Sequence, residues 1–170
     1  MKIIFATNNH FPAYGGPYFA IAELLENFLK KEINFRLIFA KNEFTKFNLN
    51  LEEIVMNFDI IHIYGLWQPF LIKVFFAARK KNKKIVFSPL GALEPWAYEQ
   101  KKLKKKIAFH LYQKRILQKA DFVLCTSYEE MENLKLLGIN SKIDVIPHGV
   151  YLQNPKKFHI MKKKKKAIFF

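Results

Sequence analysis

One segment of the chain combines the pattern of a buried β-strand with an aromatic loop: Asp59-Ile60-Ile61-His62-Ile63-Tyr64-Gly65-Leu66-Trp67. Its isoleucines form a nearly continuous apolar run, which a strand needs when helices cover both faces of its sheet. A strand with one face in water would alternate apolar and polar residues instead. The segment therefore predicts an inner strand of a parallel sheet, followed at its carboxyl end by a loop from Tyr64 to Trp67.

The same pattern recurs on both sides of this segment. Strands are predicted at residues 2–6, 34–40, 59–63, 84–88, 121–126 and 142–146, and helices at about 17–31, 51–57, 68–81, 95–119 and 127–137. Alternating strands and helices are typical of βαβ units. Ser127, followed by Glu130 three residues later, predicts a capping box at the last helix. The predicted fold class is α/β, with a doubly wound, mostly parallel Rossmann-like sheet flanked by helices.

Composition limits the class of protein. At 170 residues the chain fits one domain, expected at residues 1–150, and its 51% hydrophobic and 16% aromatic content excludes a disordered chain. Cys125 is the single cysteine, which excludes an internal disulfide or a multi-cysteine metal site and fits a reducing cytoplasm. No apolar stretch approaches the ~20 residues of a membrane span. We therefore expect a cytoplasmic protein, peripheral to the membrane at most.

The net charge of +15 is concentrated in two places. One cluster, Lys101, Lys102, Lys104, Lys105 and Lys106, opens a predicted helix, and residues 156–170 hold seven more lysines. Two explanations stay open: a coding bias toward lysine, or a basic face for an anionic membrane surface or a phosphorylated substrate. Nucleic acid is not an expected partner, because the basic residues are not interleaved with groove-reading motifs or exposed aromatics.

Ligands of parallel α/β sheets bind outside the carboxyl ends of the strands. This rule selects the segments 8–16, 64–67, 88–96, 127–130 and 147–150. Gly15 and Gly16 precede a helix start and suit a phosphate, yet the G-x-G-x-x-G spacing is missing, so a nicotinamide cofactor is not expected. Three residues keep a structural alternative: His62 as a hydrogen-bonded core residue, Trp67 as a packing anchor and Glu94 as a helix cap.

The order of these motifs resembles the N-terminal half of family 4 glycosyltransferases. The matching segments are Gly15-Gly16-Pro17, Asp59 to Trp67, Ser88 to Trp96, Ala120-Asp121 with Thr126 to Glu129, and Val145 to Val150. The resemblance implies the two-domain GT-B architecture, in which the acceptor sugar is held mainly by this domain and the nucleotide sugar mainly by the following one. It also implies retention of anomeric configuration and no metal or other cofactor.

The resemblance assigns roles to individual positions. It implies a donor-phosphate loop at Gly15 and Gly16, an acceptor cleft at His10, Tyr64, Gly65, Trp67, Gly91, Glu94 and Trp96, and a hinge at Pro147, His148 and Gly149. The lysines at 101, 102, 104, 105 and 106 are expected to contact a membrane or another anion. No catalytic residue is assigned, because the Glu-x7-Glu motif and the basic pair of the family lie in the C-terminal domain.

The end of the chain reads as a domain boundary. We expect a basic linker at residues 151–166 and, at 167–170, the start of a donor-binding domain that this chain does not contain. The expected function is the N-terminal domain of a retaining glycosyltransferase, inactive by itself, acting on a glycan or lipid-linked acceptor. The alternative is a non-catalytic acceptor- or membrane-docking subunit completed by a separately encoded donor domain. Half of a sugar-nucleotide epimerase is a further alternative, although more carboxylates and histidines than Glu94 and His62 would then be expected at the strand ends.

Overall fold

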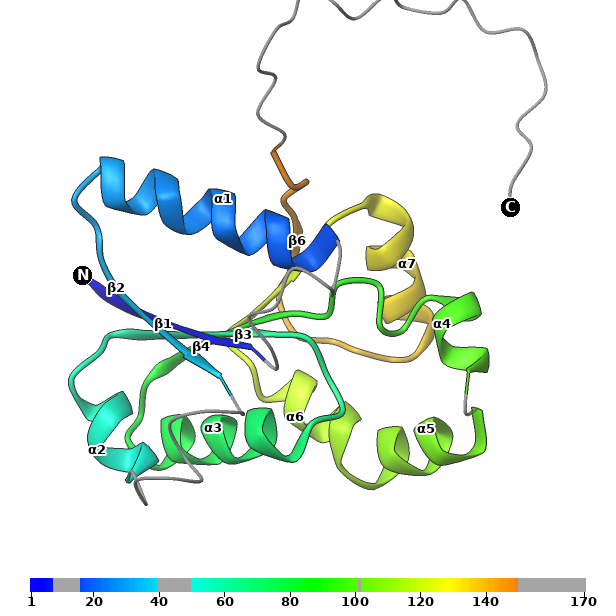
Figure 1. Ribbon diagram of the computed structural model, residues 1–170. Helices are drawn as coiled ribbons and strands as arrows, with labels where there is room; N and C mark the ends of the chain where they lie inside the picture. The colour runs from blue at the N-terminus through cyan, green and yellow to red at the C-terminus, as the bar shows by residue number, and fades with distance from the viewer. Residues whose placement is uncertain (8–15, 40–49, 101, 150–170) are drawn as a thin grey trace, which may run out of the picture.

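The computed structural model describes residues 1–7, 16–39, 50–100 and 102–149 (Figure 1). One parallel sheet contains the strands β1 (Lys2–Thr7), β2 (Asn34–Phe39), β3 (Ile60–Tyr64), β4 (Lys84–Ser88), β5 (Phe122–Cys125) and β6 (Ile143–Val145). Their order is β2-β1-β3-β4-β5-β6. The six predicted strands are confirmed, with each end placed within one residue. The winding direction reverses between β1 and β3, which is where a doubly wound sheet opens a crevice.

Both faces of the inner strands are apolar, as the continuous runs predicted. Ile4, Ile61 and Ile85 are fully buried on one face, where they join a large core. Their neighbours Ile3 and Phe5 point to the other face and form a smaller core. Successive side chains of a strand alternate between the faces, so an apolar residue at every position requires a cover on both sides.

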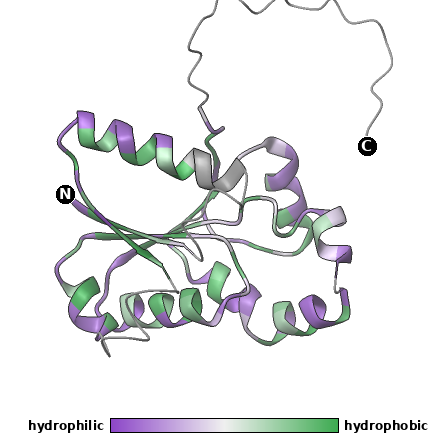
Figure 2. Ribbon diagram, in the orientation of Figure 1, coloured by the Kyte–Doolittle hydropathy of each residue, from purple (hydrophilic) through white to green (hydrophobic). Residues whose placement is uncertain are grey.

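The helices are α1 (Gly16–Lys30), α2 (Leu51–Met56), α3 (Pro69–Lys80), α4 (Pro95–Glu99), α5 (Lys102–Ala108), α6 (Lys114–Gln118) and α7 (Tyr128–Leu136). Figure 1 shows α1 on one side of the sheet and α2, α3, α5 and α6 on the other. Hydrophobic residues are concentrated in the strands, whereas most helices contain both hydrophobic and hydrophilic residues (Figure 2). None of the described helices has the length and apolar character needed to cross a bilayer.

The single helix predicted at 95–119 is wrong. The structure divides this stretch into α4, α5, a π-helical turn at Phe109–Gln113, and α6. At Gln100 the backbone turns extended (ψ 117°), which ends α4. The π-helical turn carries two buried side chains, Phe109 and Gln113, of which the second reaches the loop after β3.

On the sheet face where α1 lies, packing against the described helices differs from one part of the sheet to another. The small core beneath α1 contains side chains from β1, β2 and β3. Over β5 and β6 the same face carries Phe122 and Ile146, whose exposed fractions are 43% and 56%. A cavity of about 850 Å³ lies along this face. The rest of the fold places the carboxyl ends of β3, β4 and β5 side by side, and the candidate site is built on them.

Candidate functional site

Two loops at the carboxyl ends of β3 and β4 adopt left-handed backbone conformations. The first contains Gly65 (φ 90°) and Trp67 (φ 72°), and the second contains Leu90 (φ 56°) and Gly91 (φ 71°). A non-glycine residue in this region costs roughly 1–2 kcal/mol. The Gly65 N–H donates to the Ser88 carbonyl oxygen at 2.8 Å, which joins the two loops at their bases. Such strain persists only where surrounding contacts fix it, and it concentrates at functional sites.

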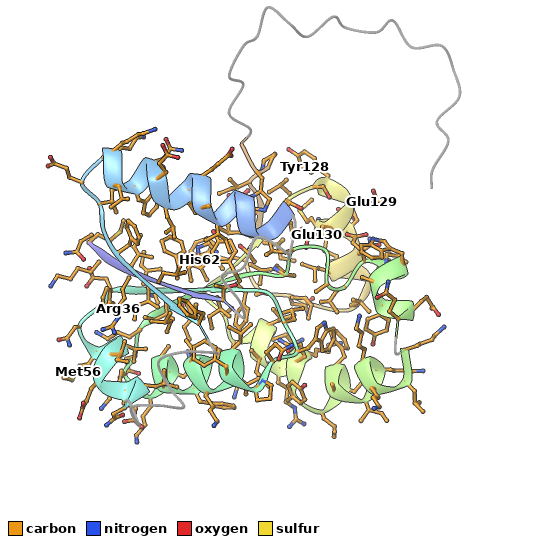
Figure 3. The ribbon with its side chains drawn as sticks, in the orientation of Figure 1. Arg36, Met56, His62, Tyr128, Glu129 and Glu130 are labelled. Atoms are coloured by element: carbon orange, nitrogen blue, oxygen red, sulfur yellow. The ribbon has the colours of Figure 1, made fainter. Side chains whose placement is uncertain are left out.

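A buried carboxylate ties the second loop to β5. Glu130, at the start of α7, is 2% exposed (Figure 3). Its Oε1 accepts a hydrogen bond from the Gly91 N–H at 2.7 Å, and its Oε2 accepts from the Thr126 N–H at 2.7 Å and the Thr126 hydroxyl at 3.0 Å. Three bonds to one carboxylate fix the position of Gly91 relative to the end of β5.

The predicted capping box is half right. Ser127 is the N-cap of α7, and its hydroxyl oxygen accepts from the Glu130 N–H at 3.1 Å. The reciprocal bond of a capping box would send the Glu130 carboxylate back to the Ser127 N–H. The carboxylate bonds to Gly91 and Thr126 instead. The spacing in the sequence found this residue, but its partner 39 positions away leaves no local signal.

Glu94 lies close to the Glu130 carboxylate that ties the second loop to β5. Its Oε2 accepts from the Asn133 side-chain amide of α7 at 2.8 Å. Glu94 occupies the N-cap position of α4, as its interpretation as a helix cap expected, but its side chain makes no cap bond. Partial burial raises the pKa of the Glu94 carboxyl, and the charges of Glu129 and Glu130 raise it further, against the bond from Asn133. The three carboxylates make this corner of the site acidic.

Trp67 is held from two sides. Its backbone N–H donates to the Gln113 Oε1 at 3.3 Å, and its ring packs against the large core with the Tyr98 ring centroid 6.4 Å away. The alternative of a packing anchor is therefore confirmed for Trp67. Its indole N–H is buried without a hydrogen-bond partner among the described residues. Trp96, on α4, is instead 69% exposed.

His62 lies on the side of the sheet that faces α1 (Figure 3). It is buried, and its Nε2 is 2.8 Å from the Ser88 hydroxyl oxygen. Its ring centroid lies 4.2 Å from that of Tyr64 and 5.5 Å from that of Phe5. Burial lowers the pKa of His62 to about 3 and raises that of the Tyr64 hydroxyl above its usual range, so both are neutral at pH 7. His62 is thus a hydrogen-bonded core residue, the alternative stated above.

The cavity on the α1 face brings together residues from distant segments. Its lining includes His62, Tyr64, Ser88, Thr126 and the three predicted hinge residues Pro147, His148 and Gly149. Gly65, Trp67, Gly91, Glu94 and Trp96 do not line it. The structure therefore separates the predicted acceptor cleft into two parts: Tyr64 faces the cavity, and the others belong to the loops at the carboxyl ends and to α4.

Several predicted positions fall elsewhere. His10, Gly15, Lys101 and residues 151–170 lie outside the described residues, and Gly16 is the first residue of α1. Lys102, Lys104, Lys105 and Lys106 lie on α5, the helix of the basic cluster. Within the described ranges no three His, Cys, Asp or Glu side chains gather in a way that could hold a metal ion.

Fold and site define a class of domain: a Rossmann-like α/β domain with left-handed loops at the carboxyl ends of β3 and β4 and a cavity on the α1 face of its sheet. Residues 7–154 match Glycosyltransferase Family 4, and the chain belongs to this family. The predicted family and fold are confirmed. The chain is 32% identical over 111 residues, 62% of its length, to an uncharacterized 41.2 kDa protein in the cps region of Klebsiella pneumoniae.

The fold is similar to that of Anabaena Alr3699/HepE, whose crystal structure was solved in complex with UDP-glucose. The TM-score is 0.55 at 15% sequence identity, over 88% of this chain. At that identity the likeness concerns the fold alone. The chain covers 30% of the Klebsiella protein and 44% of the Anabaena chain, so it spans less than half the length of either.

Proposed function

We propose that this chain is the acceptor-side domain of a retaining glycosyltransferase, which moves a sugar from a nucleotide sugar to a glycan or lipid-linked acceptor. The observation that supports this most is the pair of strained loops, Gly65 to Trp67 and Leu90 to Gly91, at the carboxyl ends of β3 and β4. They lie next to the point where the sheet changes winding direction, where doubly wound sheets bind ligands. Family membership supplies the reaction class.

The chemistry around the second loop suits sugar hydroxyls. Glu94 is part-buried, and its carboxylate, held by Asn133, accepts hydrogen bonds. Aromatic rings stack on sugar faces, and Tyr128 and Trp96 at the start of neighbouring helices are 73% and 69% exposed. A carboxylate with raised pKa beside exposed rings supports recognition of a neutral, hydroxyl-rich acceptor.

The nucleotide-sugar donor is proposed to contact this domain only at the start of α1. That helix begins at Gly16 and has no acidic residue in its first turn, so its N-terminus does not repel a diphosphate. UDP-glucose is bound in the Anabaena relative. We propose that most of the donor contacts, and the catalytic groups, belong to a following domain, so this chain alone is inactive.

Titration of the isotope-labelled chain with glucosyl lipid headgroups and free oligosaccharides, followed by amide NMR, tests the acceptor site. We expect the largest shift changes at the Gly65 and Gly91 amides. Glu94→Gln should weaken them, whereas Glu99→Gln, an exposed change on the same helix, should not. Saturable changes confined to other parts of the sheet would contradict the proposal. A docking subunit would give the same shifts, so the transfer assay described at the end of the Discussion separates the two functions.

A further inference from the structure

One exposed side of α5 carries an apolar row on an otherwise basic helix. Leu103, Ile107 and Leu111 are 73%, 52% and 67% exposed. Leu103 and Ile107 lie on α5 and Leu111 lies on the π-helical turn that continues it, and the four-residue spacing places all three along one side of this helical segment. We name this row the α5 ridge. Isolated exposed leucines are common on soluble proteins, but an aligned row on one helix marks an interaction surface.

The opposite side of the same segment is fixed to the protein. No residue of α5 itself is buried, while Phe109 and Gln113 of the following π-helical turn are 1% and 2% exposed. Lys105 donates from its Nζ to the Ala97 carbonyl oxygen, which attaches α5 to α4. The ridge is therefore presented by an anchored helix at the outer edge of the helix layer (Figure 1).

Lysines flank the ridge. Lys102, Lys104 and Lys106 are exposed, and α5 contains no acidic residue. Lys102 pairs with Glu99 at 2.7 Å, but both side chains are 61% exposed, and such surface pairs contribute little. In the part of the chain that the structure describes, Lys104 and Lys106 form no ion pair. Figure 2 shows both hydrophilic and hydrophobic residues on this helix.

We infer that the α5 ridge docks on an anionic membrane surface, with its three apolar side chains entering the headgroup boundary and its lysines contacting lipid phosphates. An interfacial helix needs this combination: an apolar row, cationic flanks and low overall hydrophobicity. A protein partner would need an acidic groove that is also lined with apolar residues. An anionic bilayer has both features, because its negatively charged headgroups lie directly above an apolar acyl region. The charge excess of +15 favours the bilayer.

Docking would place the acceptor loops close to the membrane, because α4 connects the loop after β4 to α5. This role for docking rests on the proposed function, because a lipid-linked acceptor would lie in the same membrane. The docking itself does not depend on sugar transfer, so the two can fail separately. If the chain binds vesicles but gives no transfer even when a donor-binding domain is supplied, only the proposed function is disproved.

Co-sedimentation of the full chain with vesicles tests the inference. Vesicles of phosphatidylcholine alone are compared with vesicles that also contain phosphatidylglycerol. We expect binding to the anionic vesicles, lowered about tenfold or more when Leu103, Ile107 and Leu111 are all changed to Ser. Lys104→Gln with Lys106→Gln should lower the affinity and flatten its salt dependence.

Matched controls use other helices. Leu136→Ser removes an 84% exposed leucine from α7, and Lys73→Gln removes an exposed lysine from α3; neither should change vesicle binding. Circular dichroism checks that each variant is folded. Equal binding of the ridge variant and the wild type would overturn the inference, as would failure of the wild type to bind anionic vesicles. Self-association of the wild type that the ridge variant loses, without vesicle binding, would assign the ridge to a protein interface and also overturn it.

Discussion

The carboxylate of Glu130 accepts a hydrogen bond from the backbone N–H of Gly91 at 2.7 Å, across 39 positions of sequence. The same carboxylate bonds to Thr126, so one buried side chain holds the loop after β4 against the end of β5. Gly91 has a φ of 71°, a conformation that local sequence alone would not maintain. The shape of the candidate acceptor loop therefore depends on a residue of another helix.

Replacing Glu130 tests this dependence. Glu130→Ala leaves the buried N–H groups of Gly91 and Thr126 without an acceptor, and we expect a loss of about 2–4 kcal/mol in the free energy of unfolding. Urea denaturation measures it. Glu129→Ala, an exposed change on the same turn, should stay within about 0.5 kcal/mol of the wild type. Equal effects of the two changes would show that the tether is not important for stability.

His62 predicts a specific pH dependence of stability. Its pKa in the fold is about 3, because of burial, against 6.5 for the unfolded chain. Between pH 6.5 and pH 3 the His62 ring is protonated in the unfolded chain but neutral in the folded chain. Neutral His62 therefore adds fully to the free energy of unfolding above pH 6.5, and this stability is lost as the pH falls toward 3. When the pH is lowered from 7 to about 4.5, the free energy of unfolding should therefore fall by about 2–3 kcal/mol less in His62→Phe than in the wild type. Urea denaturation at each pH measures this difference. An equal fall in the free energy of unfolding in both proteins would contradict the claim that His62 is buried and neutral.

Gln113 is expected to support the loop after β3. Its Oε1 is the acceptor for the Trp67 N–H, so Gln113→Leu keeps the volume and removes the acceptor. We expect about 1–3 kcal/mol of destabilisation and a changed Trp67 fluorescence, measured in a Trp96→Phe background. Gln118→Leu, whose amide bonds to the Gly138 carbonyl at an exposed site, should cost about 1 kcal/mol or less. An unchanged Trp67 spectrum in the Gln113 variant would argue against the contact.

Cys125 should be inert in the folded chain. The thiol is fully buried, and burial, with smaller effects from Glu130 and Glu94, raises its pKa to about 12. The thiolate is the reactive form, so an aromatic disulfide reagent at about pH 8 should label Cys125 only after the chain unfolds. The labelling rate in increasing urea then reports opening of β5. Rapid labelling without denaturant would disprove this burial.

Local patterns were sufficient for most of the fold. The apolar runs predicted the strands, and the helical patterns predicted the ends of four helices to within one residue. The segment 95–119 failed because its helical composition is continuous, while the extended backbone at Gln100 and the π-helical turn depend on tertiary packing. Periodicity describes one helix at a time and contains no information about such packing.

The candidate site was less predictable. Motif order located its loops, because ligands of parallel sheets bind at the carboxyl ends of the strands. The sequence patterns did not show that Glu130, Gln113 and Ser88 shape those loops, since their partners Gly91, Trp67 and Gly65 lie 39, 46 and 23 positions away. His62 shows the converse: its place inside an apolar strand favoured a hydrogen-bonded core residue over a chemical role, and its burial and its contact with Ser88 confirm this.

The most direct test of the central claim is a transfer assay with a panel of radiolabelled nucleotide sugars and lipid-linked or free oligosaccharide acceptors. The purified chain should give no product alone, and product should form when a donor-binding family 4 domain is supplied as a separate polypeptide. Glu94→Gln should lower that restored rate, while Glu99→Gln should not. Turnover by the chain alone would contradict the claim that it is the acceptor-side domain of a two-domain enzyme.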